Sequence, residues 1–339
     1  MRLVLLLALF AVGFFGTAAV IRSQLPEPLS NGRRLKYEHL EAHGDEYSMV
    51  FIGSSRVNHT LIPSVVEERL AAAGHEHRIY NYGIAGMRSF EADLVLENLL
   101  ELNLPKLEIV VMEWPDWDGV IFSDPTITER TVNWHDAGRT TAAVKSLWIG
   151  DYTDEVRRTE SVRHLKTFGA HLTNYGLGST WLQRQMGFET FEDLPSEVLR
   201  DGFAATGAVN DGTPEDMARR KEKTRAMLAK KHVLDLGNGI EVDPAHYQRE
   251  ALQAQAELAR SHGIRLIWAV MPGERHQPQA WRLAADEPEL PLLLFNSPKR
   301  FPEAYVIEHR WDPDHLNEEG ARVFSASFGD VLAKELERP

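Results

Sequence analysis

Short apolar runs alternate with amphipathic segments along the first part of the chain, and this alternation predicts an α/β fold. Residues 47–52, 78–82 and 107–112 are expected to be buried strands, because they are short, apolar and, in the third case, rich in β-branched residues. Residues 63–73 and 88–102 are expected to be helices. Strands that alternate with helices in this way pair in parallel and are covered by helices on both faces.

The same alternation returns near the C-terminus. Residues 244–261 are expected to form a helix, residues 264–271 a buried strand, and residues 318–336 a closing helix with large apolar residues on one face. Residues 304–307 are a candidate for one more strand. The sequence therefore predicts a doubly wound, flavodoxin-like parallel sheet with helices on both faces.

Residues 116–243 interrupt the pattern and are expected to be an insertion. Helical stretches are expected at residues 155–168 and 214–231, with segments rich in glycine and charge between them. The run 219–231 is basic, which the solvated face of a helix explains. The insertion is therefore predicted to be mainly helical.

The N-terminus carries a charge-free apolar stretch at residues 3–21, between Arg2 and Arg22. A membrane-spanning helix needs about 20 apolar residues, whereas the apolar core of a signal peptide has only about 7–15. The length favours a retained anchor, although the small residues at 16–19 also suit cleavage of a signal peptide. The domain that follows is then expected outside the cytoplasmic membrane, in the periplasm or at the cell surface.

These patterns divide the chain into three regions. Residues 1–22 are the anchor or signal, residues 23–45 are a linker with a short helix around 35–42, and residues 46–339 are the α/β domain with its insertion.

The formal net charge of −13 argues against sequence-independent binding of nucleic acids, which needs a basic surface. The chain has no cysteine, and its 14 histidines show no metal-ligand spacing, so we expect neither a thiol nucleophile nor a metal or other cofactor.

Three segments carry residues with catalytic chemistry, and each follows a predicted strand, where open α/β sheets bind their ligands. The first contains Gly53, Ser54 and Ser55, a tight turn that would expose a serine hydroxyl. It is not the Gly-x-Ser-x-Gly elbow, because Val57 replaces the second glycine. A simple turn would also account for this segment.

The other two segments supply what a serine nucleophile needs. A backbone N–H at Gly83, in the segment Asn81-x-Gly83, could donate to an oxyanion. Asp312 stands three residues before His315, close enough on a turn to reach Nδ1 of the imidazole and set its tautomer. Asn317 then suits the start of the closing helix.

Together the three segments resemble the blocks of the SGNH (GDSL-like) hydrolase family, over residues 46–115 and 244–336. The resemblance implies Ser55 as nucleophile, His315 as base and Asp312 as its acid partner, with the amides of Ser55 and Gly83 as oxyanion donors. Gly-Ser-Ser in place of Gly-Asp-Ser is similar to DltD-like and polysaccharide O-acetylation proteins of the cell envelope, which also carry an N-terminal membrane segment.

One block departs from the family pattern. The third block normally supplies an oxyanion asparagine, but residues 113–116 here are Glu-Trp-Pro-Asp. Losing one oxyanion donor can lower the rate by about 10²–10³-fold. Either a backbone N–H or the Arg56 side chain substitutes, or the site is slow or altered. The alternative is a degenerate enzyme that only binds glycans.

Several polar and aromatic residues are secondary candidates. Ser54 would be the nucleophile if the turn were shifted by one residue. Residues that could bind substrate or border the site, where ordinary loop or packing roles explain them equally well, are Arg56, Asn81, Trp114, Trp117, His59, Arg275 and His276.

The expected function is an extracytoplasmic serine acyltransferase or esterase that acts on O-acyl esters, acetyl above all, of an envelope or secreted glycan. The alternative is a non-catalytic glycan-binding or assembly factor on the same fold. Expected partners are the acylated glycan or a small ester, the membrane through the N-terminal helix, and a membrane acyltransferase; no nucleic acid is expected.

Overall fold

The computed structural model describes residues 2–23, 31–114, 120–121, 127–174, 182, 186, 196–206, 212–238 and 246–338. The chain forms two compact units. The first comprises residues 1–35, 89–94 and 117–193, and the second comprises residues 36–88, 95–116 and 194–339. The insertion expected at 116–243 is therefore divided between them, because residues from 194 onward belong to the unit that holds the sheet.

The second unit is built on a parallel sheet, which confirms the predicted α/β class. Within the described residues the sheet has five strands in the order β2-β1-β3-β4-β5. Their bounds are β1 (Met49–Gly53), β2 (Ile79–Gly83), β3 (Ile109–Glu113), β4 (Arg265–Val270) and β5 (Leu292–Leu294). Strand β2 lies on one side of β1 and β3 on the other, so the strand order reverses direction at β1. In open sheets, ligands bind outside the carboxyl ends of the strands at such a point.

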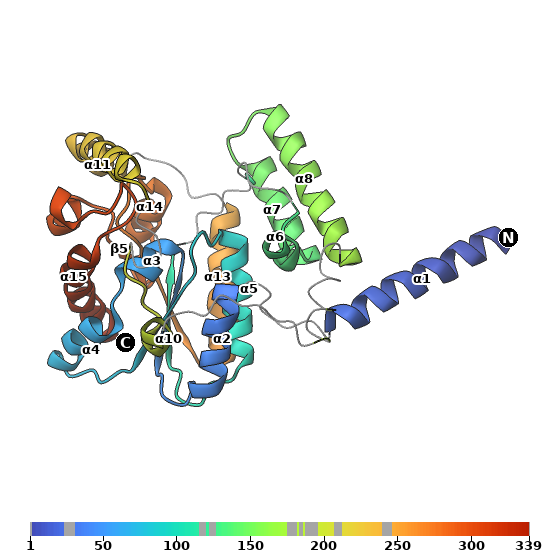
Figure 1. The fold of residues 1–339 in the computed structure, drawn as a ribbon, viewed down its shortest axis with the longest axis horizontal. Helices are drawn as coiled ribbons and strands as arrows, with labels where there is room; N and C mark the ends of the chain where they lie inside the picture. Colours follow the sequence, from blue (N-terminus) through green and yellow to red (C-terminus); the bar gives the residue numbers. More distant parts are fainter. Residues whose placement is uncertain are drawn as a thin grey trace. The chain divides into compact units, whose positions relative to one another are not determined.

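Helices connect and flank these strands (Figure 1). Helices α2 (Asn31–His43) and α5 (Ser89–Glu101) have residues in both units. The helices of the second unit are α3 (Ser55–Thr60), α4 (Pro63–Ala72), α10 (Ser196–Asp201), α11 (Pro214–Ala229), α12 (His232–Asn238), α13 (His246–Ser261), α14 (Pro278–Asp286) and α15 (Glu318–Leu336), with the 3₁₀ turns η1 (Pro302–Tyr305) and η2 (Ile307–His309).

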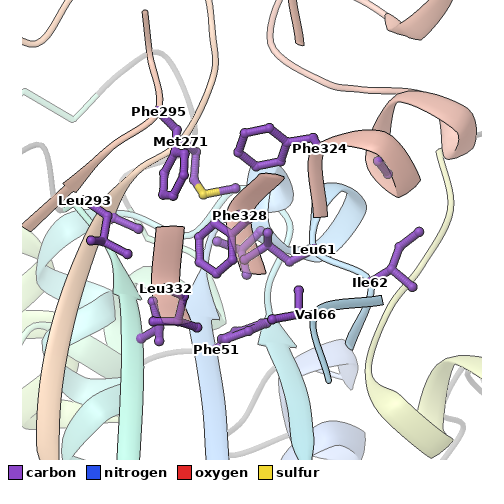
Figure 2. Close-up of a cluster of buried hydrophobic side chains, with 14 of the residues drawn as sticks. Phe51, Leu61, Ile62, Val66, Met271, Leu293, Phe295, Phe324, Phe328 and Leu332 are labelled. Carbon is purple, nitrogen blue, oxygen red and sulfur yellow. The ribbon is translucent and has the colours of Figure 1, made fainter. Parts of the chain in front are cut away.

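The core on one side of the sheet fixes the closing helix α15. Figure 2 shows Phe324, Phe328 and Leu332 of α15 among the buried side chains of the strands and α4. The Phe328 ring stacks on Phe295 at 4.8 Å and meets Phe51 of β1 edge-on at 5.6 Å. Burying one such side chain is worth about 1.5–3 kcal/mol, so several together hold α15, and the residues just before it, against the sheet.

Strand β4 also makes a contact with helix α13. Trp268 is buried and donates its indole N–H to Gln255 of α13 at 2.9 Å. Successive residues of a strand point to opposite faces, and the neighbour Ile267 belongs to the core that α15 covers. Helix α13 therefore packs on the face of β4 opposite to that core.

The first unit is helical. Its helices are α1 (Arg2–Ser23), α6 (Glu129–Trp134), α7 (Ala137–Ile149) and α8 (Asp154–Thr173). Among the described residues, α1 is the helix that is long and apolar enough to cross a membrane. Such a helix near the N-terminus can be an anchor or a signal sequence.

The predicted strands at 47–52, 78–82, 107–112 and 264–271 are confirmed to within two residues at each end. The candidate strand at 304–307 is wrong. Ala304 and Tyr305 are buried in the 3₁₀ turn η1, whose first residue is Pro302. The fifth strand is instead Leu292–Leu294, which at three residues is too short for a periodic signal.

The predicted helices at 63–73, 88–102 and 318–336 are confirmed as α4, α5 and α15. The stretches expected at 155–168 and 214–231 correspond to α8 and α11. Pro244, where a helix was expected to begin, lies outside the described residues, and α13 starts at His246.

Candidate active site

Ser55 stands at the point where strand β1 turns into helix α3. The strand ends at Gly53, and Ser54 caps the helix, because its Oγ accepts a hydrogen bond from the Arg56 N–H at 3.2 Å. Ser55 is the first residue of the helix and is half-buried. The capping role of Ser54 leaves Ser55 as the serine that faces the other predicted site residues.

The turn before Ser55 requires a glycine for space. A Cβ on Gly53 would overlap the Val57 side chain and would lie 2.9 Å from Glu113 Oε2. The missing side chain thus allows α3 and the end of β3 to approach β1 closely.

The structure brings Ser55, His315 and Asp312 together. Ser55 Oγ lies 2.7 Å from His315 Nε2, and the two Asp312 carboxylate oxygens each lie 2.9 Å from His315 Nδ1. A carboxylate only accepts hydrogen bonds, so Nδ1 carries a proton and Nε2 of the neutral ring accepts from the serine hydroxyl. This is the geometry that a base needs to activate a serine.

Asp312 is kept ionised by its surroundings. Partial burial acts to raise its pKa, but the hydrogen bond and charge of His315 and the N–H groups of Asp314 and His315 outweigh it. Both N–H groups donate to Asp312 Oδ1 at 2.8 Å. The net result is a pKa below the usual range of an aspartate, so Asp312 stays a carboxylate and can stabilise an imidazolium.

The loop that carries Asp312 and His315 is held at both ends. Asn317 caps α15, with its Oδ1 accepting from the Gly320 N–H at 2.9 Å. Before the loop, the buried Arg310 donates to the carbonyl of Ala304 at 2.6 Å and to that of Pro313 at 3.0 Å. These contacts fix the direction in which His315 points.

The two expected oxyanion donors differ in their availability. The Ser55 N–H makes no hydrogen bond to any residue in the described part of the chain, as expected at the first position of a helix. The Gly83 N–H instead donates to Asn81 Oδ1 at 2.9 Å. Gly83 could serve an oxyanion only by exchanging this bond for a bond to the ligand.

Asn81 has a role that differs from the expected binding of substrate. Its side chain is fully buried, and its Nδ2 donates to the carbonyls of Val57 at 2.9 Å and Leu61 at 2.7 Å. With Oδ1 bonded to Gly83, all its polar groups are used within the protein. Asn81 therefore joins the end of β2 to α3 and its C-cap.

Lys36 of α2 is a buried cation beneath the site. Its presence there was not expected from the sequence. Its Nζ lies near four oxygens: Asn58 Oδ1 at 2.7 Å, and the carbonyls of Asn81 at 3.1 Å, Gly83 at 2.8 Å and Gly202 at 2.6 Å. Burial lowers the pKa of Lys36 to about 7, against the opposing effect of Asp201. An ammonium has three N–H donors and a neutral amine two, so these oxygens favour the charged form.

Glu113 occupies the end of β3, where the resemblance would place an asparagine. Its Oε2 accepts from the Ser54 N–H at 2.5 Å, and its Oε1 lies 2.6 Å from Arg56 Nε. The Arg56 guanidinium is thus engaged by a carboxylate. Trp114 is buried, and Pro115, Asp116 and Trp117 lie outside the described residues.

His59 is a neighbour of the catalytic candidates. Its ring meets that of His315 edge-on with centroids 5.8 Å apart, and its Nδ1 donates to the Ala204 carbonyl at 2.6 Å. Burial lowers the pKa of His59, and the Ala204 carbonyl raises it only in part, so the ring is neutral at physiological pH with Nε2 as an acceptor.

A cavity of about 680 Å³ adjoins His315 and Asp312. Helix α11 contributes Arg220 and Lys223 to its wall, and the exposed His276 also lines it. Arg275 is exposed but does not line this cavity. Apolar side chains of Met227, Val233 and Leu234 complete a space that is open to a ligand beside the triad.

Within the described ranges, no group of three or more histidine, aspartate or glutamate side chains could hold a metal ion.

No family model matches the chain, and no curated protein matches it.

Proposed function

We propose that this protein is an SGNH-type serine hydrolase or O-acyltransferase that acts outside the cytoplasmic membrane on acyl esters, acetyl above all, of an envelope or secreted glycan. The observation that carries the proposal is the contact of Ser55 Oγ with His315 Nε2, at 2.7 Å, in a ring whose Nδ1 is held by Asp312. Ser55 and His315 are 260 positions apart in sequence, so closeness in the sequence does not explain their contact.

In the proposed reaction, His315 Nε2 takes the proton of Ser55 Oγ while that oxygen bonds to the ester carbonyl carbon. The carbonyl oxygen becomes an oxyanion at the free N–H of Ser55. The ester C–O bond then breaks, and the protonated His315 gives its proton to the departing alcohol. An acyl-serine remains. Water or a sugar hydroxyl then gives a proton to His315 and attacks the acyl carbon. The bond from that carbon to Ser55 Oγ breaks, and His315 returns the proton to Ser55 Oγ.

The fold that we propose for the catalytic unit is the doubly wound, flavodoxin-like form of the α/β class. The parallel strand order β2-β1-β3-β4-β5 and the contact of α13 with β4, opposite the α15 face, support it. The catalytic loops then lie at the carboxyl ends of the strands, on the proposed substrate crevice.

The donors around Ser55 favour slow acyl transfer, or binding without catalysis, over rapid hydrolysis. The asparagine expected in the third block is replaced by Glu113, and the Gly83 N–H is bonded to Asn81. Each missing oxyanion donor costs about 10²–10³ in rate. Slow attack by water is an advantage in a transferase, because the acyl-enzyme must survive until the glycan acceptor arrives. A membrane acyltransferase would supply the acyl group.

The location outside the membrane rests on α1. This helix has 22 residues and is apolar over its length, so it is long enough to span a bilayer and to tether the catalytic unit near a membrane partner.

The alternative function is a glycan-binding or assembly factor without catalysis, and the engaged Gly83 amide is the observation that favours it. A fluorophosphonate probe separates the two, since it reacts covalently with an activated serine. We expect the full chain to be labelled at Ser55, as read by mass spectrometry, and labelling to be lost in Ser55→Ala and His315→Ala.

Ser54→Ala is the matched control for this experiment. Ser54 caps α3, and removing a cap costs about 1 kcal/mol of stability without removing the nucleophile, so labelling should persist. Labelling at Ser54 would exclude Ser55 as the nucleophile and move that role to Ser54. No labelling of the folded protein would exclude an activated serine and leave the binding factor. Once labelling is established, release of acetate from an acetyl ester with and without glycan acceptors distinguishes the esterase from the transferase.

A further inference from the structure

Helix α8 of the first unit exposes three large apolar side chains while it buries several polar ones. Its apolar side chains Val162, Leu165 and Leu172 are 49%, 58% and 43% exposed. Its buried residues, in contrast, are mostly polar: Glu160, Ser161, His164, Thr167 and Ala170. Soluble helices normally turn the apolar stripe toward the core.

Hydrogen bonds inside the unit hold α8 in this orientation. His164 Nδ1 lies 2.9 Å from Nε2 of the buried His135, whose own Nδ1 donates to the Thr131 carbonyl at 2.5 Å. The buried Glu160 pairs with Arg163 at 2.7 Å. Rotating α8 to bury the apolar stripe would leave these polar groups unpaired, at about 1–3 kcal/mol each.

The end of α7 extends the exposed apolar surface. Trp148 and Ile149 are 54% and 47% exposed. Trp148 donates its indole N–H at 3.1 Å to Ser161 of α8, the residue before Val162, which holds the ring against α8. Trp148, Ile149, Val162, Leu165 and Leu172 are called the α7–α8 apolar surface below.

This surface is joined to the helix that can span a membrane. Arg22, in the last turn of α1, donates to Asn174 Oδ1 at 2.9 Å and to the His171 carbonyl at 3.1 Å, and Asn174 Nδ2 donates to the Ala18 carbonyl. The C-terminal ends of α1 and α8 therefore lie beside each other (Figure 1). If α1 spans a bilayer, its last turn is at the membrane boundary, and Leu172 is within one turn of it.

We propose that the α7–α8 apolar surface inserts into the headgroup boundary of the same bilayer that α1 spans. The proposal rests on α1 being a membrane anchor. Arg158 and Lys166, both exposed, stand four residues before Val162 and four after it, on the same side of α8 as the stripe. Glu155, also exposed, stands seven residues before Val162 on this side, so the two cations leave the stripe with an excess of one positive charge. An apolar stripe with this excess fits a membrane surface with anionic lipids.

Insertion of this surface can be measured on the full chain, because the protein contains no cysteine and single cysteines are unique labels. The variants are Leu165→Cys in the surface, Leu6→Cys in α1 and Ala71→Cys on the exposed side of α4 in the second unit. Each is labelled with a fluorophore sensitive to polarity and reconstituted into vesicles of phosphatidylethanolamine and phosphatidylglycerol. Lipids brominated along their acyl chains then quench a label that reaches them.

We expect the label at Leu165→Cys to emit at shorter wavelength and to be quenched at a depth of about 5–10 Å, typical of an interfacial helix. The label at Leu6→Cys, about 10 Å from the middle of α1, should be quenched within the acyl-chain region, and that at Ala71→Cys should not be quenched. Adding Val162→Glu and Leu172→Glu should abolish quenching at Leu165→Cys, because the charges oppose insertion.

Each failure has a distinct meaning. Quenching at Leu6→Cys without quenching at Leu165→Cys would overturn the insertion of the α7–α8 surface while keeping the anchor, and would leave the surface to a protein partner. Absence of quenching at both would overturn the anchor and the insertion together. Equal quenching at Leu165→Cys and Ala71→Cys would show non-specific adsorption and would also overturn the proposal.

Discussion

The fold lowers the pKa of Asp312, so the contribution of this residue to the free energy of unfolding depends on pH. Its pKa in the folded protein lies below the usual value, because the His315 contact and two N–H donors outweigh burial. The stabilisation is therefore present above the unfolded-state pKa of about 4 and is lost as the pH falls through the folded-state value.

The test compares the wild type with Asp312→Asn in denaturant unfolding at several pH values. The free-energy difference between the two should be constant near neutral pH and should shrink on acidification below about pH 4. Asp45→Asn removes a carboxylate at an exposed position and is the control for the loss of one negative charge. A difference that stays constant into acid would contradict the depressed pKa.

Gly83 illustrates how closely the backbones approach beside the site. A Cβ at this position would overlap the backbone N of Asn58 in α3. Gly83→Ala should therefore destabilise the fold by about 1–3 kcal/mol, as overpacking does. The control is Gly169→Ala in α8, where a Cβ meets no atom within 4 Å and alanine favours a helix. Equal unfolding midpoints for the two variants would refute the steric argument.

At the scale of elements, Lys36 links α2 to the two elements that carry the oxyanion and nucleophile candidates. Its ammonium contacts Asn58 of α3 and the Asn81 and Gly83 carbonyls of β2. Lys36→Met would fill a similar volume but leave several buried oxygens without a donor, each worth about 1–3 kcal/mol.

We therefore expect Lys36→Met to lose at least about 2 kcal/mol of unfolding free energy and to lower the rate of fluorophosphonate labelling at Ser55. Lys334→Met, on the exposed side of α15, is the matched control and should change stability by no more than about 0.5 kcal/mol. Unchanged labelling in a destabilised Lys36→Met would show that Lys36 supports the fold alone and does not position the site.

At the scale of the whole molecule, α1 is the helix that can act as a membrane anchor if it is retained or as a signal sequence if it is cleaved. The length of its apolar stretch favours retention over cleavage. We expect the full chain to remain in membranes washed with alkaline carbonate and to keep its N-terminus intact by mass spectrometry. A variant that begins at residue 24 should be extracted, because interfacial binding is weaker than a spanning helix. An N-terminus found after residue 19 would instead show a cleaved signal.

The sequence by itself determined the strands and helices whose patterns repeat along the chain. Apolar runs and helical spacing are local properties, and they located β1 to β4 and the helices α4, α5 and α15. The short strand Leu292–Leu294 gave no such signal, and the 3₁₀ turn at Ala304 was mistaken for a strand because both elements bury apolar residues.

At the site, the sequence identified residues whose chemistry is visible in a short motif. Asp312 and His315 stand on one loop, so their contact follows from local spacing. The meeting of His315 with Ser55 was implied by resemblance and depends on how α15 packs against β1.

Only the tertiary structure decided the roles of Asn81, Glu113 and Lys36. Each makes hydrogen bonds or ion pairs to segments far away in sequence, such as Gly202 for Lys36 and Ser54 for Glu113. The same holds for α8, whose exposed apolar stripe follows from the polar partners inside its unit. A sequence pattern records which residues share a face, whereas the contacts of the folded chain determine which face is buried.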